Sequence, residues 1–256
     1  MRSRSPFLVP LSCALCVALA LAVPAAASGD LAAEKASLAA AVQANPGDYA
    51  AQWNLARVLI DLGNQEPDGG RKKALFEEAV THARAAVALQ PGDTWGHHYL
   101  AASVGKLALT VGGKQKIELS KEVRDEAEKA IACDPNNDRS HHILGRWNRE
   151  VSHLSPVLKL AAKVVYGGVP QGASDEKAVA EFKEAIRINP QHVNHRLELG
   201  ITYMEMKQFE AAIAEFETAL SLPDADPNDA RYKAEARENI RVCEKKVDRQ
   251  NEKRRH

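Results

Sequence analysis

The segment Asn45-Pro46-Gly47-Asp48 is followed by Leu55-Ala56, so a leucine and a small residue stand nine and ten positions after the proline. The same arrangement recurs at Gln90-Pro91-Gly92-Asp93 with Leu100-Ala101, Asp134-Pro135-Asn136-Asn137 with Leu144-Gly145, and Asn189-Pro190-Gln191-His192 with Leu199-Gly200. These prolines are 45, 44 and 55 residues apart, and Pro223 follows after 33 more. A proline among polar residues ends one helix, and the leucine with its small neighbour marks the packing face of the next. Four copies in register predict an array of helix pairs, an architecture that usually serves binding.

The first 27 residues are typical of a targeting segment. Arg2 and Arg4 form a basic start, residues 7–23 are almost wholly apolar, and Ala25-Ala26-Ala27 resembles a cleavage site. The sequence therefore predicts a signal peptide at residues 1–27 and a protein that is secreted or periplasmic after cleavage. A retained membrane anchor is the first alternative, against which the short apolar run argues. A mitochondrial presequence ranks third, because it would need more arginine.

Charge and composition argue against nucleic acid as a partner. The chain has 34 basic and 34 acidic residues, and removal of residues 1–27 takes away two arginines and no acid, which leaves 32 against 34. A near-neutral chain has no bulk electrostatic reason to bind nucleic acid. Beyond residue 27 the only cysteines are Cys133 and Cys243, which a solenoid would hold far apart, so we expect two buried thiols rather than a disulfide.

The repeat register predicts one helical repeat domain at residues 28–250. It comprises a cap helix at 28–45, repeats at about 48–91, 93–135, 137–190 and 192–223, and a C-terminal capping helix at 229–249, followed by a basic tail at 251–256. The third repeat contains an insertion in which Ser155-Pro156 starts a short apolar helix, Val157 to Tyr166. We expect this helix to pack on the convex side of the array; the alternative is an exposed docking element for a partner or a membrane surface.

The fourth repeat resembles a tetratricopeptide repeat. The residues at or within one position of that motif's spacing are Leu199-Gly200, Tyr203, Phe209, Ala212, Phe216, Ala219 and Pro223. The first three repeats keep the leucine, the small residue and the proline but are longer by roughly 10 to 20 residues. The predicted fold is therefore all-α, a right-handed superhelical solenoid of tetratricopeptide-like helix pairs with expanded middle repeats.

The expanded repeats resemble those of the regulator of microtubule dynamics family. The resemblance covers about residues 80–225 and rests on His97-His98-Tyr99-Leu100, Gly112-Gly113-Lys114-Gln115-Lys116-Ile117, His141-His142-Ile143-Leu144-Gly145-Arg146-Trp147 and Asp175-Glu176-Lys177-Ala178. Members are tetratricopeptide-like proteins that associate with microtubules or organelle contacts, in some cases with lipid. The resemblance implies such a role if the chain stays inside the cell, whereas a cleaved secretory signal would put it where microtubules are absent.

One face of the first helix of each repeat is expected to line a concave groove. At about 100° per residue, the positions five before, two before, two after and five after each leucine point away from the packing face. These positions hold two tryptophans, two histidines and four arginines but no carboxylate. The predicted ligand-binding groove comprises Trp53, Arg57, Trp95, His98, Arg139, His142, Arg146, Arg149 and Met204.

A cationic groove lined by aromatic residues suits an anionic extended ligand, either an acidic peptide or an anionic lipid headgroup. The competing interpretation is a solvated groove in which the arginines pair with Glu150 or Glu198. A metal site is not favoured, because neighbouring histidines on a helix point about 100° apart. The chain also lacks the motifs of a catalytic nucleophile, a phosphate-binding loop or a zinc protease. We therefore predict an exported, non-enzymatic binding scaffold without a cofactor, for a protein or peptide partner; the alternative is a lipid-binding or membrane-contact protein.

Overall fold

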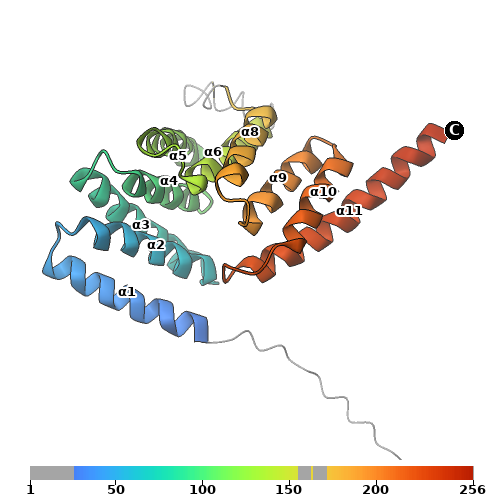
Figure 1. Ribbon diagram of the computed structural model, residues 1–256. Helices are drawn as coiled ribbons and strands as arrows, with labels where there is room; N and C mark the ends of the chain where they lie inside the picture. The colour runs from blue at the N-terminus through green and yellow to red at the C-terminus, as the bar shows by residue number, and fades with distance from the viewer. Residues whose placement is uncertain (1–25, 155–162, 164–171, 256) are drawn as a thin grey trace, which may run out of the picture.

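Figure 1 shows the computed structural model, which describes residues 26–154, 163 and 172–255. Within these ranges the regular elements are all helices, stacked side by side as antiparallel pairs (Figure 1). Helix α1 (Ala26–Ala44) precedes the pairs, and α11 (Asp229–Arg255) follows them. The pairs are α2 (Tyr49–Gln65) with α3 (Gly69–Leu89), α4 (Thr94–Ala108) with α5 (Gly113–Cys133), α6 (Asp138–Ser152) with α8 (Asp175–Ile188), and α9 (Val193–Glu205) with α10 (Phe209–Ser221). The predicted all-α solenoid of tetratricopeptide-like helix pairs is confirmed.

Polar residues just after the prolines begin the first helix of most pairs. The side chains of Asp48, Asp93 and Asn137 each accept a hydrogen bond from a backbone N–H in the first turn of α2, α4 and α6. Such a cap satisfies one of the four N–H groups that a helix start leaves without a partner. His192, at the start of α9, makes no cap bond of this kind.

The leucine and its small neighbour lie in the core of every pair. The leucines at the four equivalent positions are between 0 and 8 % exposed, and Ala56 and Ala101 are fully buried. At Gly145 and Gly200 a methyl group would stand 2.9 and 2.5 Å from the ring of a phenylalanine on the second helix. The last two pairs therefore use glycine because an aromatic ring packs directly on the backbone of the first helix.

Two local predictions were wrong. From the sequence, the glycine at position 63 predicts the end of the first helix of the first repeat, but α2 continues to Gln65. Gly63 is buried, and an added Cβ would overlap the ring of Phe76, so this glycine permits close packing. Cys133 was expected to be buried, but it is exposed because it is the last residue of α5; Cys243 is buried, and both thiols are free.

Two further expectations concern segments that the structure leaves undescribed. The apolar helix predicted at Val157 to Tyr166 lies outside the described residues except for Lys163. The signal peptide predicted at residues 1–27 overlaps them only at its last two residues, in α1. Among the helices of the described ranges, none combines the length and apolar character needed to cross a bilayer.

Candidate functional site on the inner face of the array

A polar side chain six residues after each proline joins the two helices of a pair. This position is occupied by Gln52, His97, His141 and Arg196. Their partners on the second helix are His82 at 2.8 Å, Glu126 at 2.5 Å, Glu181 at 2.7 Å and Glu215 at 2.8 Å, respectively. The first three also contact the carbonyl oxygen of the preceding proline, at 3.0, 2.9 and 3.1 Å.

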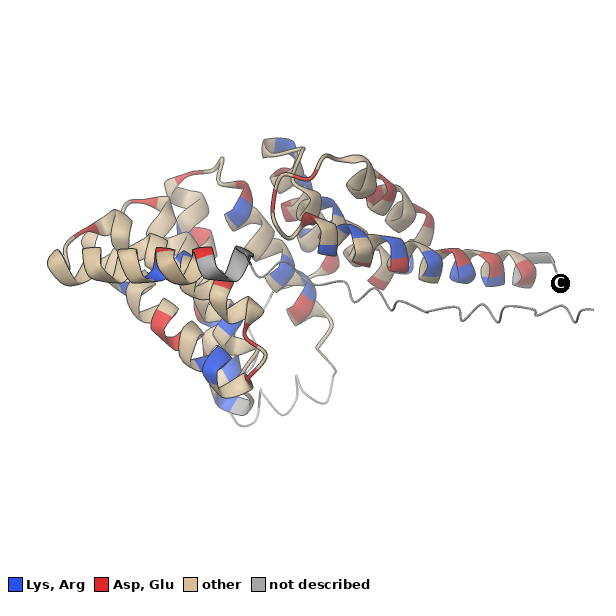
Figure 2. Ribbon diagram, turned by 90° about the horizontal axis from the view of Figure 1, so that it is seen from below, with Lys and Arg blue, Asp and Glu red and all other residues tan. Residues whose placement is uncertain are grey.

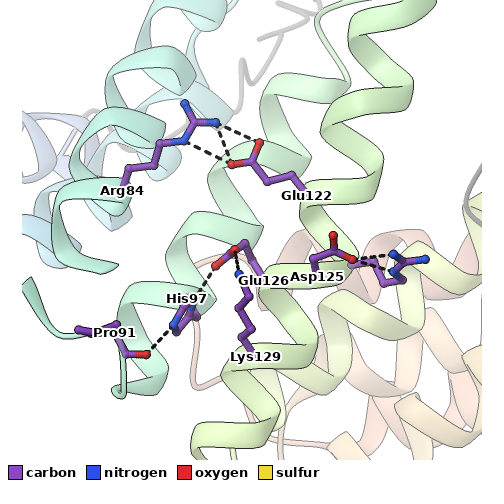
Figure 3. A network of polar contacts seen from close by, with 8 residues as sticks. Arg84, Pro91, His97, Glu122, Asp125, Glu126 and Lys129 are labelled. Atoms are coloured by element: carbon purple, nitrogen blue, oxygen red, sulfur yellow. Dashed lines mark hydrogen bonds and ion pairs between the residues drawn. The ribbon is translucent and has the colours of Figure 1, made fainter. Parts of the chain in front are cut away.

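Figure 3 shows one of these contacts, with His97 between the Pro91 carbonyl and Glu126, which also binds Lys129 at 2.7 Å. In the third pair, burial lowers the pKa of His141, but its hydrogen bonds to Glu181 and to the Pro135 carbonyl outweigh burial and leave the pKa raised. The first histidine of each His-His sequence is therefore a structural link within its pair.

The second histidine of each His-His sequence lies in the joint with the next pair. His98 is buried, with Nδ1 3.1 Å from the Ser140 hydroxyl on α6. His142 is partly buried, with Nδ1 2.9 Å from Nδ1 of His195 on α9. Burial, reinforced by the charge of Arg139, lowers the pKa of His98 to about 3, so this ring is neutral at neutral pH. The two histidines join successive repeats and add no cationic charge to the groove, which differs from the role expected for them.

Three aromatic rings form a continuous surface across α2 and α4, which we call the aromatic platform: Trp53, Trp95 and Tyr99. Their ring centroids lie 5.4 to 6.1 Å apart, and their planes differ by 5° to 25°. Trp95 is 36 % exposed, and Trp53 is partly exposed. Burial raises the pKa of the Tyr99 hydroxyl, and the positive charge of Arg139 on α6 acts in the opposite direction. The platform and Arg139 thus span three successive first helices.

Most of the predicted groove arginines pair with carboxylates of this chain. Arg57 binds Glu34 of α1 and lies 3.5 Å from Asp61. Arg146 lies 3.0 Å from Glu150 and 3.5 Å from Glu198. Arg57 and Arg146 therefore fit the competing interpretation, in which the groove arginines pair with carboxylates of this chain, better than the interpretation in which their guanidinium groups are free.

Arg149 differs most from expectation. It was placed on the outward face, but it is 7 % exposed, with Nη1 2.6 Å from a carboxylate oxygen of Glu198 and 3.2 Å from the Glu198 carbonyl. Its Nε lies 3.5 Å from Glu205. Helix α9 therefore covers this face of α6, because the superhelix brings adjacent first helices into contact. Met204 is likewise partly buried and packs on the core formed by α9, α10 and α11.

The inner face is the side of the array formed by the first helices of the pairs, α2, α4, α6 and α9. Two cations on this face have no carboxylate within 4.0 Å among the described residues. One is Arg139, which is exposed, and the other is Lys106, in the last turn of α4, which is partly buried. Burial, followed by the charges of Arg146 and Arg231, lowers the pKa of Lys106 to about 8. These two side chains can still bind an external anion.

Lys106 and Tyr99 were absent from the predicted groove, although the sequence contains a signal for Lys106. Asp61, Lys106, Glu150 and Glu205 all stand fifteen positions after their proline. The predicted groove used the position five residues after each leucine, which is fourteen residues after the proline. The row of charged residues lies one position further along the chain. Across the molecule, basic and acidic residues are interspersed, as Figure 2 shows. The described residues contain no group of three or more histidines, cysteines and carboxylates that could hold a metal ion.

A solved structure with the same architecture is TTC0263, a thermophilic tetratricopeptide protein of Thermus thermophilus. The superposition covers 82 % of this chain and 92 % of that protein, with a TM-score of 0.59 and 19 % sequence identity. At this identity the match supports the fold alone.

Curated relatives carry the name of one family. Regulator of microtubule dynamics protein 1 of Caenorhabditis elegans is 25 % identical over 191 residues, which cover 75 % of this chain and 84 % of the relative. Regulator of microtubule dynamics protein 3 of Bos taurus is 27 % identical over 187 residues, which cover 73 % of this chain but 40 % of the relative. The chain thus matches most of one relative and less than half of the other.

These relatives contradict the predicted location. They are eukaryotic proteins named for microtubule dynamics, and microtubules lie inside cells. The prediction of a secreted or periplasmic protein is therefore wrong. It rested on residues 1–27, where an apolar run with a basic start has more than one meaning.

The family assignment covers nearly all of the helical array. The sequence pattern of the family described as regulator of microtubule dynamics protein 1-3 matches residues 28–244, from α1 into α11. This range contains the four helix pairs, both His-His sequences and the aromatic platform. The chain belongs to the regulator of microtubule dynamics family.

Proposed function

We propose that this chain is a non-enzymatic scaffold whose inner face binds a peptide segment of a protein partner through the aromatic platform. The observation that carries the proposal is the exposure of Trp95, stacked on Trp53 and Tyr99 on the first two of the four helices that form the inner face. Exposed tryptophan beside a second aromatic ring is typical of the residues that dominate binding energy in interfaces. A rigid stack also loses little conformational entropy when a ligand binds.

The two unpaired cations favour an acidic segment. Arg139 adjoins the platform through Tyr99, and Lys106 stands on the same helix as Trp95. A peptide carboxylate beside Arg139 could accept two parallel hydrogen bonds from the guanidinium. The paired residues Arg57, Arg146 and Arg149 contribute less, because a ligand would have to compete with their internal carboxylates.

The partner that the family suggests is the microtubule. The relatives are named as regulators of microtubule dynamics, and we extend that role to this chain as a proposal. Co-sedimentation with microtubules assembled from purified tubulin tests it directly. The wild-type chain should sediment with the polymer, and the bound fraction should fall with added salt if the unpaired cations contribute.

Two variants test the inner face. Trp95→Ala and Arg139→Glu should each weaken binding about tenfold or more, the usual effect of losing a central interface residue. Leu109→Ala is the matched control, because Leu109 is also an exposed apolar residue but follows the end of α4, away from the platform. Equal binding by all three variants would exclude the platform as the binding surface. Failure of the wild-type chain to sediment would exclude the microtubule, and a library of acidic peptides would then be screened with the same variants.

A further inference from the structure

The joint between the third and fourth helix pairs contains a continuous chain of polar side chains. Asn194 Nδ2 lies 3.5 Å from Nε2 of His142, whose Nδ1 lies 2.9 Å from Nδ1 of His195. His195 Nε2 lies 3.0 Å from Oδ2 of Asp138, which also accepts a hydrogen bond of 3.0 Å from Asn189. His195 is 1 % exposed. The joint therefore depends on how hydrogen atoms are shared between two imidazole rings.

The short contact between the two rings restricts their protonation. One Nδ1 atom must carry a hydrogen and the other must accept it. When both rings are neutral, His195 uses its hydrogen on Nε2 to donate to Asp138, so its Nδ1 is the acceptor. His142 then donates from Nδ1 and accepts from Asn194 at Nε2. In the neutral chain the hydrogen bonds therefore all run in one direction, from Asn194 of α9 to His142 of α6, then to His195 of α9 and finally to Asp138 of α6.

The same atoms can hold one extra proton. With a hydrogen on both nitrogens, His195 donates to Asp138 and to His142, and the positive charge lies beside a carboxylate. His142 then carries its hydrogen on Nε2, which can be donated to Oδ1 of Asn194 after the amide turns over. In the structure Oδ1 of Asn194 is buried and has no hydrogen-bond partner. One proton thus preserves the chain, with Oδ1 of Asn194 in place of Nδ2 as the partner of His142.

A second proton cannot be accommodated. Two doubly protonated rings have no acceptor between them, and two positive charges would stand 2.9 Å apart across the joint. His192 stacks on His195 with ring centroids 4.1 Å apart, and its buried Nδ1 has no partner. A charge on His192 would therefore add to the repulsion.

The other elements packed on the joint do not compensate a second charge. Helix α6 contributes Arg146 and Arg149, whose charges act on His142, and Arg139, whose charge acts on His192. From helix α8, the ring of Phe182 packs against His142 in an edge contact, with ring centroids 5.5 Å apart. This ring is uncharged and cannot neutralise a proton on His142. The acidic groups are Asp138, which already binds His195, Glu198, which already pairs with Arg146 and Arg149, and Asp226, whose charge acts on His192.

We propose that this joint is a proton-operated hinge, which keeps its hydrogen bonds after taking up one proton and opens between α6 and α9 after taking up a second. This proposal is independent of which ligand the inner face binds. Opening would change how α6 and α9 face each other, so it would reshape the inner surface at the third and fourth repeats.

The direction of the pH effect follows from linkage. Burial, followed by the charge of His195, lowers the pKa of His142 well below 6.5 and that of His192 to about 4. Above pH 6.5 both histidines are neutral in the closed and the open joint, and they do not affect the equilibrium. As the pH falls below 6.5, His142 and His192 take up protons in the open joint but not in the closed joint. The closed joint therefore loses stability relative to the open joint. Burial raises the pKa of Asp138, but its bonds to His195 and Asn189 outweigh this and hold it at about 2, so Asp138 stays ionised throughout this window.

The chain itself supplies a matched replacement for His195. Ser140 occupies the position equivalent to His195 in the preceding joint, where it meets His98. His195→Ser therefore copies a joint that already exists in this protein but removes the second imidazole. The control is His97→Gln, which copies Gln52 at the same position of the first repeat and leaves the His142–His195 contact intact.

Hydrogen exchange of the full chain, compared as protection factors at pH 7.0 and 5.0, tests the hinge. In the wild-type chain and in His97→Gln, protection of residues 138–145 and 193–199 should fall about tenfold or more at pH 5.0, while α2 and α3 change little. In His195→Ser the fall in these two segments should disappear. An equal fall in His195→Ser, or a uniform fall along the whole wild-type chain, would overturn the proposal.

Nitrogen chemical shifts of the imidazole rings provide a second measurement in case His195→Ser does not fold. In the wild-type chain, hydrogen on both nitrogens of His142 should appear only together with loss of protection at the joint. Two doubly protonated rings in a joint that remains protected would overturn the proposal.

Discussion

At the scale of single residues, position within the repeat decides what a side chain does. Ten residues after the proline stands alanine in the first two repeats and glycine in the last two. Where glycine occurs, Phe182 or Phe216 packs on its backbone and is itself fully buried. Glycine and phenylalanine therefore occur together in the fourth repeat for a steric reason. A larger residue at the glycine position would overlap the phenylalanine ring.

Gly200→Ala should lower the free energy of unfolding by about 1–3 kcal/mol, because its methyl group would lie 2.5 Å from the Phe216 ring. Leu199→Ala, which empties a fully buried site, should cost about 2–5 kcal/mol. Gly92→Ala is the control, since nothing lies within 4 Å of the added atom. Urea denaturation measures all three. Unchanged stability of both Gly200→Ala and Leu199→Ala would contradict the packing described here.

Arg149→Glu should destabilise the chain by about 3–5 kcal/mol, because it would leave Glu198 buried opposite a second carboxylate. Arg139→Glu, on an exposed side chain of the same helix, should change stability by no more than about 0.5 kcal/mol. Chemical denaturation distinguishes them. Similar stabilities would mean that the Arg149–Glu198 pair contributes nothing to folding.

At the scale of helices, caps connect local structure to the stacking of repeats. Asp48 caps α2 through one hydrogen bond to Ala51. Asn137 caps α6 in the same way, and its amide also donates to the Thr94 hydroxyl at 2.8 Å, which in turn donates to the Ala130 carbonyl at 3.0 Å. A cap of the third repeat is therefore also a link to the second.

Asn137→Ala should consequently cost more than Asp48→Ala. Loss of a simple cap costs about 1 kcal/mol, and loss of the hydrogen bond that the Asn137 amide donates to the buried Thr94 hydroxyl should add about 0.5–1.5 kcal/mol. Thermal unfolding followed by circular dichroism gives the comparison. If the two variants melt together, the link between Asn137 and Thr94 does not stabilise the stack.

Much of this organisation could be predicted from the sequence, since prolines, caps and the leucine with its small neighbour are local signals. Gly63 was misread because a buried packing glycine and a helix stop look alike in sequence. Glu198 was foreseen as a possible partner of the groove arginines, but the sequence could not decide between pairing and a free cationic groove, because the choice depends on the rotation of α9 against α6. The links six residues after each proline were detectable in principle, because polar residues recur there at a fixed spacing.

At the scale of the whole molecule, each repeat is stabilised by its neighbours along the stack. The last core contains residues of α9 and α10 together with Ala236 and Cys243 of α11, both fully buried. Helix α11 takes the place of a next repeat and covers the apolar face of the fourth pair (Figure 1). In a solenoid the effect of removing an end should fall off with distance along the stack.

Truncation of the chain before Asp229 should therefore loosen the fourth pair and leave the first two pairs nearly unchanged. Loss of α11 exposes buried side chains of α10, among them Phe216, and apolar area returned to water costs about 25 cal/mol per Å². Hydrogen exchange should show protection in α9 and α10 reduced about tenfold or more, with α2 to α5 retained. Truncation after Gln250 is the control, since Asn251 and Glu252 are exposed and make no core contact. Loss of protection along all the pairs would instead show that the stack unfolds as one cooperative unit, because coupling between pairs would then exceed the stability of each pair.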